Sequence, residues 1–455
     1  MNTSVHIDNR QFYRTLLAIA VPIALQNLIA SSFTMVDNIM VGKMGETALA
    51  SVGLATQLFS VQWMMIFGLC SGCSTFYSQF WGTSDVKSIR KTLGFAWTAC
   101  VSLSLIFFLV AQFAPGFVLG LFTNEPIAIE QGKGYLTIAA VNFLFVAICQ
   151  PVVAALRATQ QTKPPLYITI AAFFTNTCLN YCLIFGNFGF PRLEIRGAAI
   201  ATVISRALET VLTLYCLFGR KNPLTGPFAD YFKFGREFAF RIARNAAATT
   251  CNETLWGAGI AAQNAAFGHM GITEFASYKA AASVSDFFLM SCFAVSNAAL
   301  VLLGERLGRG EFEYAKKLAT KLLRVGVVFA AVMATLMYLC RLPLLGLFNL
   351  SPEGIAWASK VLFIIAIMQP LSMHNAFQIT GTMRGGGDAK FAAICEIGTI
   401  YLIRVPLSFF GALVLGLPIY GAYALAEVEN IIKGVILYAR YKTGKWVKNM
   451  IGGME

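Results

Sequence analysis

The sequence predicts an all-α integral membrane protein of about twelve transmembrane helices, arranged as two six-helix bundles. Three observations predict this fold. The residues are 57% hydrophobic and only 13% charged, long apolar runs recur along the chain, and the second half repeats the first. A soluble chain of this size needs far more charge to cover its surface.

Each predicted span is a run long enough to cross a bilayer, which takes about 20 apolar residues at helical rise. Such runs lie near residues 14–40, 48–76, 92–117, 132–156, 164–186, 197–218, 240–266, 274–302, 319–340, 356–381, 391–415 and 420–439. Backbone groups in hydrocarbon must be hydrogen-bonded internally, which leaves helices or a closed barrel. The runs do not alternate every second residue, so helices are favoured.

The formal net charge of +13 could suggest a nucleic-acid partner. The basic residues, however, lie mainly between the apolar runs. With the N-terminus inside, the outer segments hold only Lys43, Lys133, Arg192, Arg196 and Arg341. The positive-inside rule therefore predicts a multi-pass protein of the cytoplasmic (inner) membrane with both termini cytoplasmic, and no nucleic-acid binding. The polar start of the chain has no cleavage site, so no removable signal peptide is expected.

An internal repeat supports two halves. Val41–Ser51 matches Phe267–Ser277 at Gly, Met, Gly, Thr, Ala and Ser, and Leu119–Phe122 recurs as Leu345–Phe348, both 226 residues later. The region after residue 189 recurs one residue further out of phase. Six helices per half give both halves one orientation, so we expect a pseudo-two-fold axis along the membrane normal and a substrate cavity between the halves.

The repeat also sets the predicted domain boundaries. A segment with Pro223, Gly226 and Pro227 separates the halves and indicates a cytoplasmic linker. The predicted domains are an N-terminal six-helix lobe at 1–218, the linker at 219–238 and a C-terminal six-helix lobe at 239–455.

Asp37 and Glu253 are the leading candidates for function, because an ionisable group inside a membrane helix is costly. Asp37 shares its predicted span with Gln26 and Thr34, at spacings that form a polar stripe expected to face the protein interior. Glu253 lies mid-span and could exchange a proton. The alternative is that each is a buried, hydrogen-bonded carboxyl that only fixes helix packing. Pro22 predicts a bend, for gating or for packing.

Neutral polar residues accompany these carboxylates. Asn176 and Asn180 are spaced i, i+4 on one helix face, and Thr202 begins the next span. Their oxygens beside an aspartate form a plausible set of cation ligands, although asparagines also join membrane helices without any further function. His374 could relay protons, but a satisfied core histidine is more common.

Other buried charges have simpler explanations. Arg206 with Glu209, and Glu429 with Lys433, have the spacing of ion pairs along one helix and are expected to be structural. The remaining charges could line a cavity: Lys279, Asp286, Glu396, Arg404 and Glu427.

No enzyme or cofactor site is expected. HExxH, P-loop and GxSxG motifs are absent. Cys70 and Cys73 have metal-site spacing without a second pair or a nearby His, so small buried thiols are the better interpretation. Gly385–Asp388 follows a span and is expected to form a cytoplasmic turn.

Several motifs in order resemble the multidrug and toxic compound extrusion (MATE) family from about residue 12 to residue 440. They are Val36–Gly42, Asn180–Gly186, Gly197–Thr202, Asn252–Trp256 and Gly381–Asp388. The resemblance implies two six-helix bundles in a V shape that alternate access and export organic cations, in exchange for H⁺ or Na⁺. It also implies a coupling-cation site, with Na⁺ possible, at Asp37, Asn176, Asn180 and Thr202.

The resemblance further places Glu253 at the family's seventh-helix glutamate, in the second lobe's cation site or the substrate path. The NorM-type, sodium-coupled branch has an acidic residue in the tenth helix. Here that stretch reads Met373–Phe377, with His374 and Asn375 but no carboxylate, which favours H⁺. Gln26, Thr34, His374 and Asn375 complete the expected substrate and cation path.

The expected function is therefore cation-coupled export of organic cations or multidrug compounds by a monomer in the bilayer. The alternative is a flippase for lipid-linked or anionic substrates on the same twelve-helix plan, which predicts a basic cavity. Arg206, Lys279 and Arg404 keep this alternative open. A lipid-modifying membrane enzyme would need paired Asp-rich motifs or a buried His with a carboxylate, and the sequence shows neither.

Overall fold

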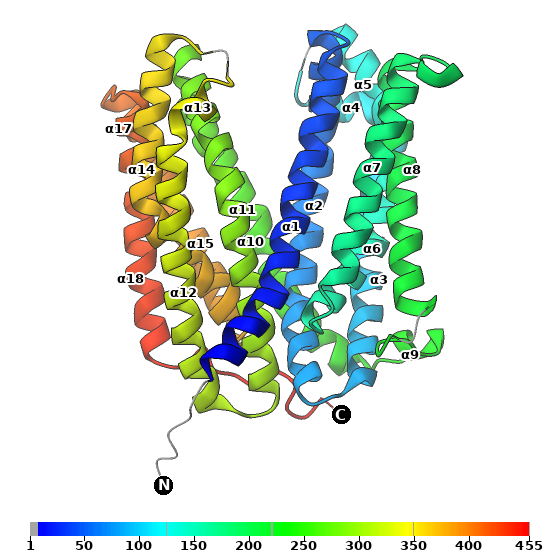
Figure 1. Ribbon diagram of the computed structural model, residues 1–455, viewed down its shortest axis with the longest axis vertical. Helices are drawn as coiled ribbons and strands as arrows, with labels where there is room; N and C mark the ends of the chain where they lie inside the picture. The colour runs from blue at the N-terminus through cyan, green and yellow to red at the C-terminus, as the bar shows by residue number, and fades with distance from the viewer. Residues whose placement is uncertain (1–7, 124, 220–221, 349, 455) are drawn as a thin grey trace. The chain divides into compact units, whose positions relative to one another are not determined.

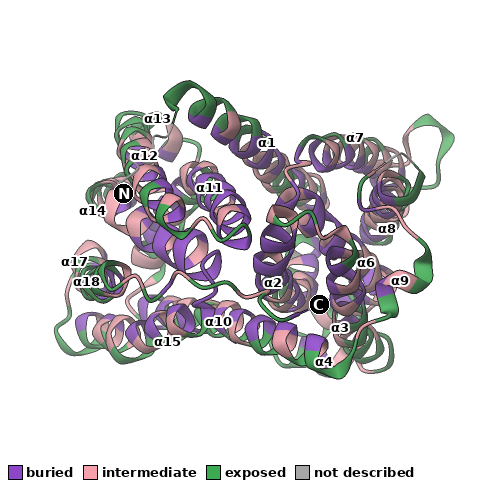
Figure 2. Ribbon diagram, turned by 90° about the horizontal axis from the view of Figure 1, so that it is seen from below, coloured by how far each residue is buried: buried purple, intermediate pink, exposed green. Residues whose placement is uncertain are grey.

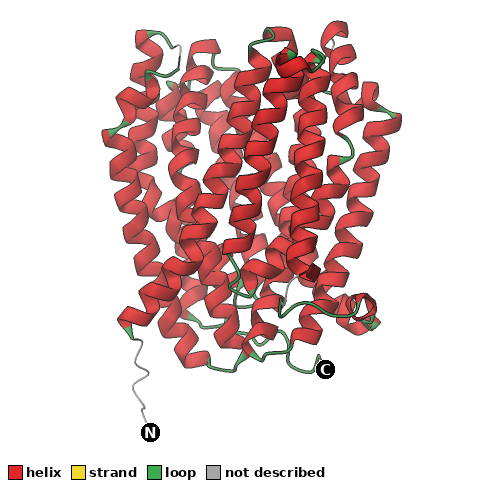
Figure 3. Ribbon diagram, turned by 45° about the vertical axis from the view of Figure 1, so that its right-hand side comes forward, coloured by secondary structure: helices red, strands yellow, loops and turns green. Residues whose placement is uncertain are grey.

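The computed structural model of the chain describes residues 8–123, 125–219, 222–348 and 350–454. Helices make up nearly all of this part of the chain, and no strand occurs in it (Figure 3). The predicted all-α class is confirmed. Residues 220 and 221 of the predicted linker lie outside the described ranges.

The elements are labelled in chain order in Figure 1. They are α1 (Asn9–Gly42), α2 (Glu46–Gly82), α3 (Val86–Phe113), α4 (Pro115–Gly120), α5 (Pro126–Ala139), α6 (Asn142–Ala158), α7 (Lys163–Phe185), η1 (Asn187–Gly189), α8 (Glu194–Leu214), η2 (Tyr215–Gly219), α9 (Phe228–Phe232), α10 (Arg236–Gly268), α11 (Ile272–Gly308), α12 (Phe312–Leu339), α13 (Arg341–Leu345), α14 (Pro352–Ala376), η3 (Phe377–Arg384), α15 (Ala389–Thr399), η4 (Ile400–Arg404), α16 (Val405–Phe409), η5 (Phe410–Val414), α17 (Ile419–Ala426) and α18 (Val428–Lys442).

The helices fit the twelve predicted spans. In the described part of the chain, nine helices are long and apolar enough to cross a membrane, and the pair Ile129–Ala139 and Asn142–Ala158, bent by 46°, makes a tenth. The seventh predicted span is α10, which is long but rich in polar residues. The twelfth is the pair α17 and α18, which is broken at Glu427.

The described residues form two compact units. The carboxyl-terminal unit comprises Met1–Ala24, Ser74–Ser84 and Ala247–Met454, and the amino-terminal unit comprises Leu25–Cys73 and Asp85–Ala246. Helices α1, α2 and α10 therefore each contribute to both units. In α1 the division follows closely after Pro22, which lies inside the continuous helix. The predicted domain boundaries remain a prediction.

Helix α11 lies deep in the carboxyl-terminal unit. Its residues from Ala298 to Glu305 are all buried (Figure 2), so this stretch is covered on every side. The final turns of α2 contact it through small residues on both helices. A Cβ atom on Gly82 would lie 2.1 Å from the carbonyl oxygen of Glu305, and one on Gly308 would lie 2.0 Å from that of Gln79. This reciprocal contact needs glycine on both helices.

We expect Gly308→Ala to destabilise the carboxyl-terminal unit by about 1–3 kcal/mol, the usual cost of overpacking. The added methyl group meets backbone rather than a mobile side chain, so the helices must separate. Thermal unfolding of the detergent-solubilised protein measures the change. The matched control is Gly53→Ala in α2, where a Cβ atom meets nothing within 4 Å. Equal effects of the two substitutions would contradict the close contact.

The chain after α18 returns to the turn that follows η3. The Lys448 amide donates to the carbonyl of Gly386 (3.0 Å), and its ammonium contacts Asp388 (2.5 Å). Gln79 accepts from the Met450 amide (2.7 Å). The side chain of Trp446 is 1% exposed beside them. The predicted turn at Gly385–Asp388 is confirmed, and this terminal segment fixes it at the end of η3.

Candidate functional site

Asp37 of α1 meets both asparagines of α7. The side-chain amide of Asn180 donates to the Asp37 carboxylate and to Oδ1 of Asn176 (2.9 Å). One turn of helix separates the two asparagines, so a single amide can bridge them. Both are buried, at 1% exposure for Asn176 and 0% for Asn180. The sequence prediction that these three residues lie together therefore matches the geometry.

Helix α8 completes this group, which we name the Asp37 cluster: Asp37, Tyr135, Asn176, Asn180, Thr202 and Ser205. Nδ2 of Asn176 lies 3.5 Å from the hydroxyl oxygens of both Thr202 and Ser205. The buried phenol of Tyr135, from α5, interacts with Thr202 and Asp37. Tyr135 and Ser205 were not anticipated from the sequence, because a Tyr and a Ser in apolar helices carry no distinctive pattern.

The Asp37 cluster offers oxygen ligands without a neutralising base. No basic nitrogen of the described residues lies within 4 Å of the Asp37 carboxylate, because Arg206 is paired instead with Glu209 (2.6 Å). That pairing was predicted and is confirmed. Oδ1 of Asn180 is buried and has no hydrogen-bond partner among the described groups. A carboxylate, an unpaired amide oxygen and hydroxyls suit a proton or a small hard cation.

Gln26 lies apart from this cluster, although it shares α1 with Asp37. Its Oε1 accepts from Nη2 of Arg157 in α6 (2.5 Å), and its Nε2 donates to Oγ1 of Thr169 in α7 (3.1 Å). Thr34, the third member of the predicted stripe, is exposed. The sequence gave no signal for Arg157 or Thr169 here, because contacts between distant helices leave no local spacing.

Glu253 of α10 forms an ion pair that the sequence did not predict. Nη2 of Arg384, at the end of η3, contacts Oε1 of Glu253 at 2.5 Å. The Arg384 side chain is 3% exposed, and its carbonyl oxygen accepts from Oγ1 of Thr75 (2.8 Å). The candidate carboxylate of the second half thus has a fixed cationic partner, unlike Asp37.

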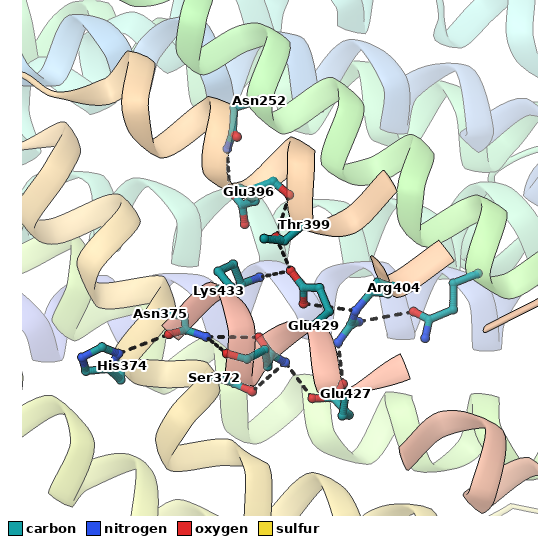
Figure 4. A network of polar contacts seen from close by, with 12 residues as sticks. Asn252, Ser372, His374, Asn375, Glu396, Thr399, Arg404, Glu427, Glu429 and Lys433 are labelled. Carbon is teal, nitrogen blue, oxygen red and sulfur yellow. Dashed lines mark hydrogen bonds and ion pairs between the residues drawn. The ribbon is translucent and has the colours of Figure 1, made fainter. Parts of the chain in front are cut away.

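The carboxyl-terminal unit contains a larger polar group, which we name the carboxyl-terminal network (Figure 4). Its residues are Asn252, Gln263, Ser372, His374, Asn375, Glu396, Thr399, Arg404, Glu427, Glu429, Asn430 and Lys433. They come from α10, α14, α15, η4, the α17–α18 junction and α18. Residues singled out separately in the sequence are therefore joined.

Ion pairs form the centre of this network. Arg404 contacts Glu427 at 2.5 Å and Glu429 at 3.5 Å, and Lys433 contacts Glu429 at 3.0 Å. The predicted pair of Glu429 with Lys433 is confirmed. Thr399 donates to Oε1 of Glu429 (2.6 Å) and links α15 to α18. Arg404 and Glu427, which were expected to lack a local partner, bind each other.

His374 and Asn375 lie at one edge of the network. Nδ1 of His374 is 3.2 Å from Oδ1 of Asn375, whose amide donates to the Asn430 carbonyl (2.8 Å). Lys279 and Asp286 of α11 form no ion pair with any described residue within 4 Å, although each feels the charge of the other. The eleven cysteines are all free thiols.

The comparisons with known proteins agree on one family. The MatE family model matches residues 22–182 and 246–410. The uncharacterized transporter YisQ of Bacillus subtilis is 23% identical over 412 residues, covering 90% of each chain. A probable multidrug resistance protein NorM of Thermotoga maritima is 23% identical, covering 96% of this chain and 94% of its own.

The fold also matches solved structures. A transporter of the MOP superfamily from Pyrococcus furiosus superposes with a TM-score of 0.87 at 15% identity, over 97% of this chain and 99% of its own. A MATE crystal structure in a bent conformation gives a TM-score of 0.86 at 15% identity, over 95% and 96% of the two chains. With the family model covering both halves, the chain belongs to the MatE family, the multidrug and toxic compound extrusion family that its motifs resemble.

Proposed function

We propose that this protein is a cation-coupled antiporter that exports organic cations, including multidrug compounds, by alternating access. The observation that carries the proposal is the Asp37 carboxylate, which is held by an asparagine amide and has no basic partner within 4 Å among the described residues. Relatives named as multidrug resistance proteins support an efflux role.

The coupling follows from which conformation each ligand favours. A proton or Na⁺ that binds the Asp37 cluster changes the packing between α1, α7 and α8 and stabilises one conformation. A substrate that favours the other conformation is then released as the cation binds, because coupling requires only opposite preferences. Asp37, Asn176, Asn180 and Thr202 are the proposed cation ligands. Glu253, Gln26, Thr34, His374 and Asn375 are the proposed residues of the substrate and cation path.

H⁺ is the favoured coupling ion. The fourteenth helix offers His374 and Asn375 where a second carboxylate would be needed for sodium in the other half, and Glu253 is already paired with Arg384. We further propose a monomer in the cytoplasmic (inner) membrane with both termini cytoplasmic, as the distribution of basic residues favours.

A flippase for lipid-linked or anionic substrates is the second candidate. Arg157 supports it, because its guanidinium contacts Gln26 and no carboxylate of the described residues lies within 4 Å. The Pyrococcus furiosus structure is described as having a binding pocket of reverse polarity that suggests a different function. An unneutralised arginine would suit an anionic group.

Transport in liposomes tests the proposal. The purified protein is reconstituted, and ethidium, a fluorescent organic cation, is followed under an imposed pH gradient and then under a sodium gradient. Accumulation driven by either gradient is expected and identifies the ion. Ethidium that neither binds nor responds to either gradient, together with scrambling of a labelled anionic lipid, would replace the antiporter by the flippase.

A further inference from the structure

The internal repeat relates two polar triads, one in each unit. In the amino-terminal unit, Arg157 and Thr169 both contact Gln26. Asn252 lies 226 residues after Gln26, and Arg384 and Glu396 lie 227 residues after Arg157 and Thr169. These offsets are those of the repeat before and after its shift in phase.

The second triad keeps the contacts of the first but changes its charge. Nδ2 of Asn252 donates to Oε2 of Glu396 at 2.6 Å, as Gln26 donates to Thr169. Arg384 binds Glu253, the neighbour of Asn252 in α10. The hydroxyl of Thr169 in one half is therefore replaced by the carboxylate of Glu396 in the other.

Glu396 is the carboxylate left over when the charges around it are paired. The bases Arg384, Arg404 and Lys433 contact Glu253, Glu427 and Glu429 respectively, at 2.5, 2.5 and 3.0 Å. No basic nitrogen of the described residues lies within 4 Å of Glu396. Four carboxylates face three bases, so one negative charge is unbalanced.

Every element that packs on α15 contributes to the surroundings of Glu396. Lys433 from α18, Arg384 from η3 and Glu253 from α10 act on it electrostatically. Glu429 of α18 is tied to α15 through Thr399, and Arg404 of η4 is held by the two glutamates. Both charged ends of the π-helical segments, Arg384 and Arg404, are thus committed to other partners. Segments of this kind are frequent at functional sites.

Asn252 supplies the second observation. Its side chain is 1% exposed, and its Oδ1 has no hydrogen-bond partner among the described groups. An ionised carboxylate cannot donate to that oxygen, whereas a protonated one carries an O–H. A carboxylic acid and a primary amide can then pair through two hydrogen bonds. Protonation of Glu396 would satisfy the buried oxygen and remove the unbalanced charge together.

We propose that Glu396 and Asn252 form a proton-binding site in the carboxyl-terminal unit, separate from the Asp37 cluster. Glu396 exchanges the proton during the transport cycle, and Asn252 is the residue that orients it. The nearby Lys433 and Arg384 make the site unsuited to a metal cation, which their charges repel. The role in transport rests on the proposed antiport, but proton binding itself does not.

Infrared difference spectroscopy of the detergent-solubilised protein tests proton binding without any transport. Spectra recorded between roughly pH 5 and pH 9 show each protonated carboxyl group by its C=O stretch, which shifts in heavy water. We expect Glu396→Gln to remove one titrating component from this region. Asp37→Asn is expected to remove a different one. Addition of Na⁺ should leave the Glu396 component unchanged.

Two further variants make the assignment specific. Asn252→Ala keeps the carboxyl group but removes its amide partner, so it should shift the frequency and the titration midpoint of the Glu396 component. Glu427→Gln is the matched control, because Glu427 is already neutralised by Arg404 and should contribute no titrating component. Thermal unfolding checks that each variant is folded.

The outcomes separate this inference from the antiport. A Glu396→Gln spectrum identical to that of the wild type would overturn the proton site, and so would a component displaced by Na⁺ rather than by pH. Loss of the component in Glu396→Gln, its shift in Asn252→Ala and its retention in Glu427→Gln would establish the site. Absence of gradient-driven ethidium transport in the wild type would instead overturn the antiport and leave proton binding to stand.

Discussion

Asp37→Asn is expected to abolish gradient-driven transport of ethidium while leaving ethidium binding intact. Asparagine nearly matches aspartate in size and can still accept the hydrogen bond from Asn180. It can neither take up a proton nor neutralise Na⁺. Since coupling free energies are typically about 1–3 kcal/mol, uptake should fall by roughly 5-fold to 150-fold. Liposome flux under each gradient and a fluorescence binding titration measure the two properties separately.

Two variants control this result. Asp286→Asn removes a carboxylate from an exposed position of α11, outside the Asp37 cluster, and should leave coupling unchanged. Asn180→Ala removes the amide that holds Asp37 and should weaken the response to the driving ion without eliminating it. Wild-type flux in Asp37→Asn under either gradient would exclude Asp37 as the coupling site.

The fold could be predicted largely from sequence, because membrane spans follow from length and apolarity alone. The interruptions could not. The predicted span at 132–156 is broken between α5 and α6 at Ala140 and Val141, two apolar residues that carry no breaking signal. The last predicted span is broken at Glu427, where the side chain binds Arg404. Tertiary contacts rather than local propensity decide such positions.

The candidate site could be predicted only where its residues are close in sequence or lie on one helix face. Asn176 and Asn180 share a face of α7, and their spacing was sufficient to group them. The contact of Asn252 with Glu396 joins residues 144 apart, and no local pattern indicates it. The repeat is the one sequence signal that relates such a pair to its counterpart, Gln26 with Thr169.

Arg404→Gln is expected to destabilise the protein by about 3–5 kcal/mol, the usual cost of breaking a buried ion pair. Arg404 is 12% exposed, and its partners Glu427 and Glu429 are 5% and 0% exposed. Without the guanidinium, Glu427 keeps only the amide of Asn430, while Glu429 still has Lys433. Denaturant unfolding in detergent micelles measures the free energy of unfolding.

The double variant Arg404→Gln with Glu427→Gln distinguishes unpaired charge from lost packing. It removes one positive and one negative group, so no carboxylate is left unpaired, and replacing a buried pair is often nearly neutral. We therefore expect it to recover most of the lost stability. Arg306→Gln is the surface control, because its pair with Glu311 is about one-third exposed on both sides and should contribute at most about 1 kcal/mol. If the double variant were as unstable as Arg404→Gln, Arg404 would stabilise the fold through packing and its bond to Gln263, and the ion pairs of the network would not be what holds α15 and α18 together.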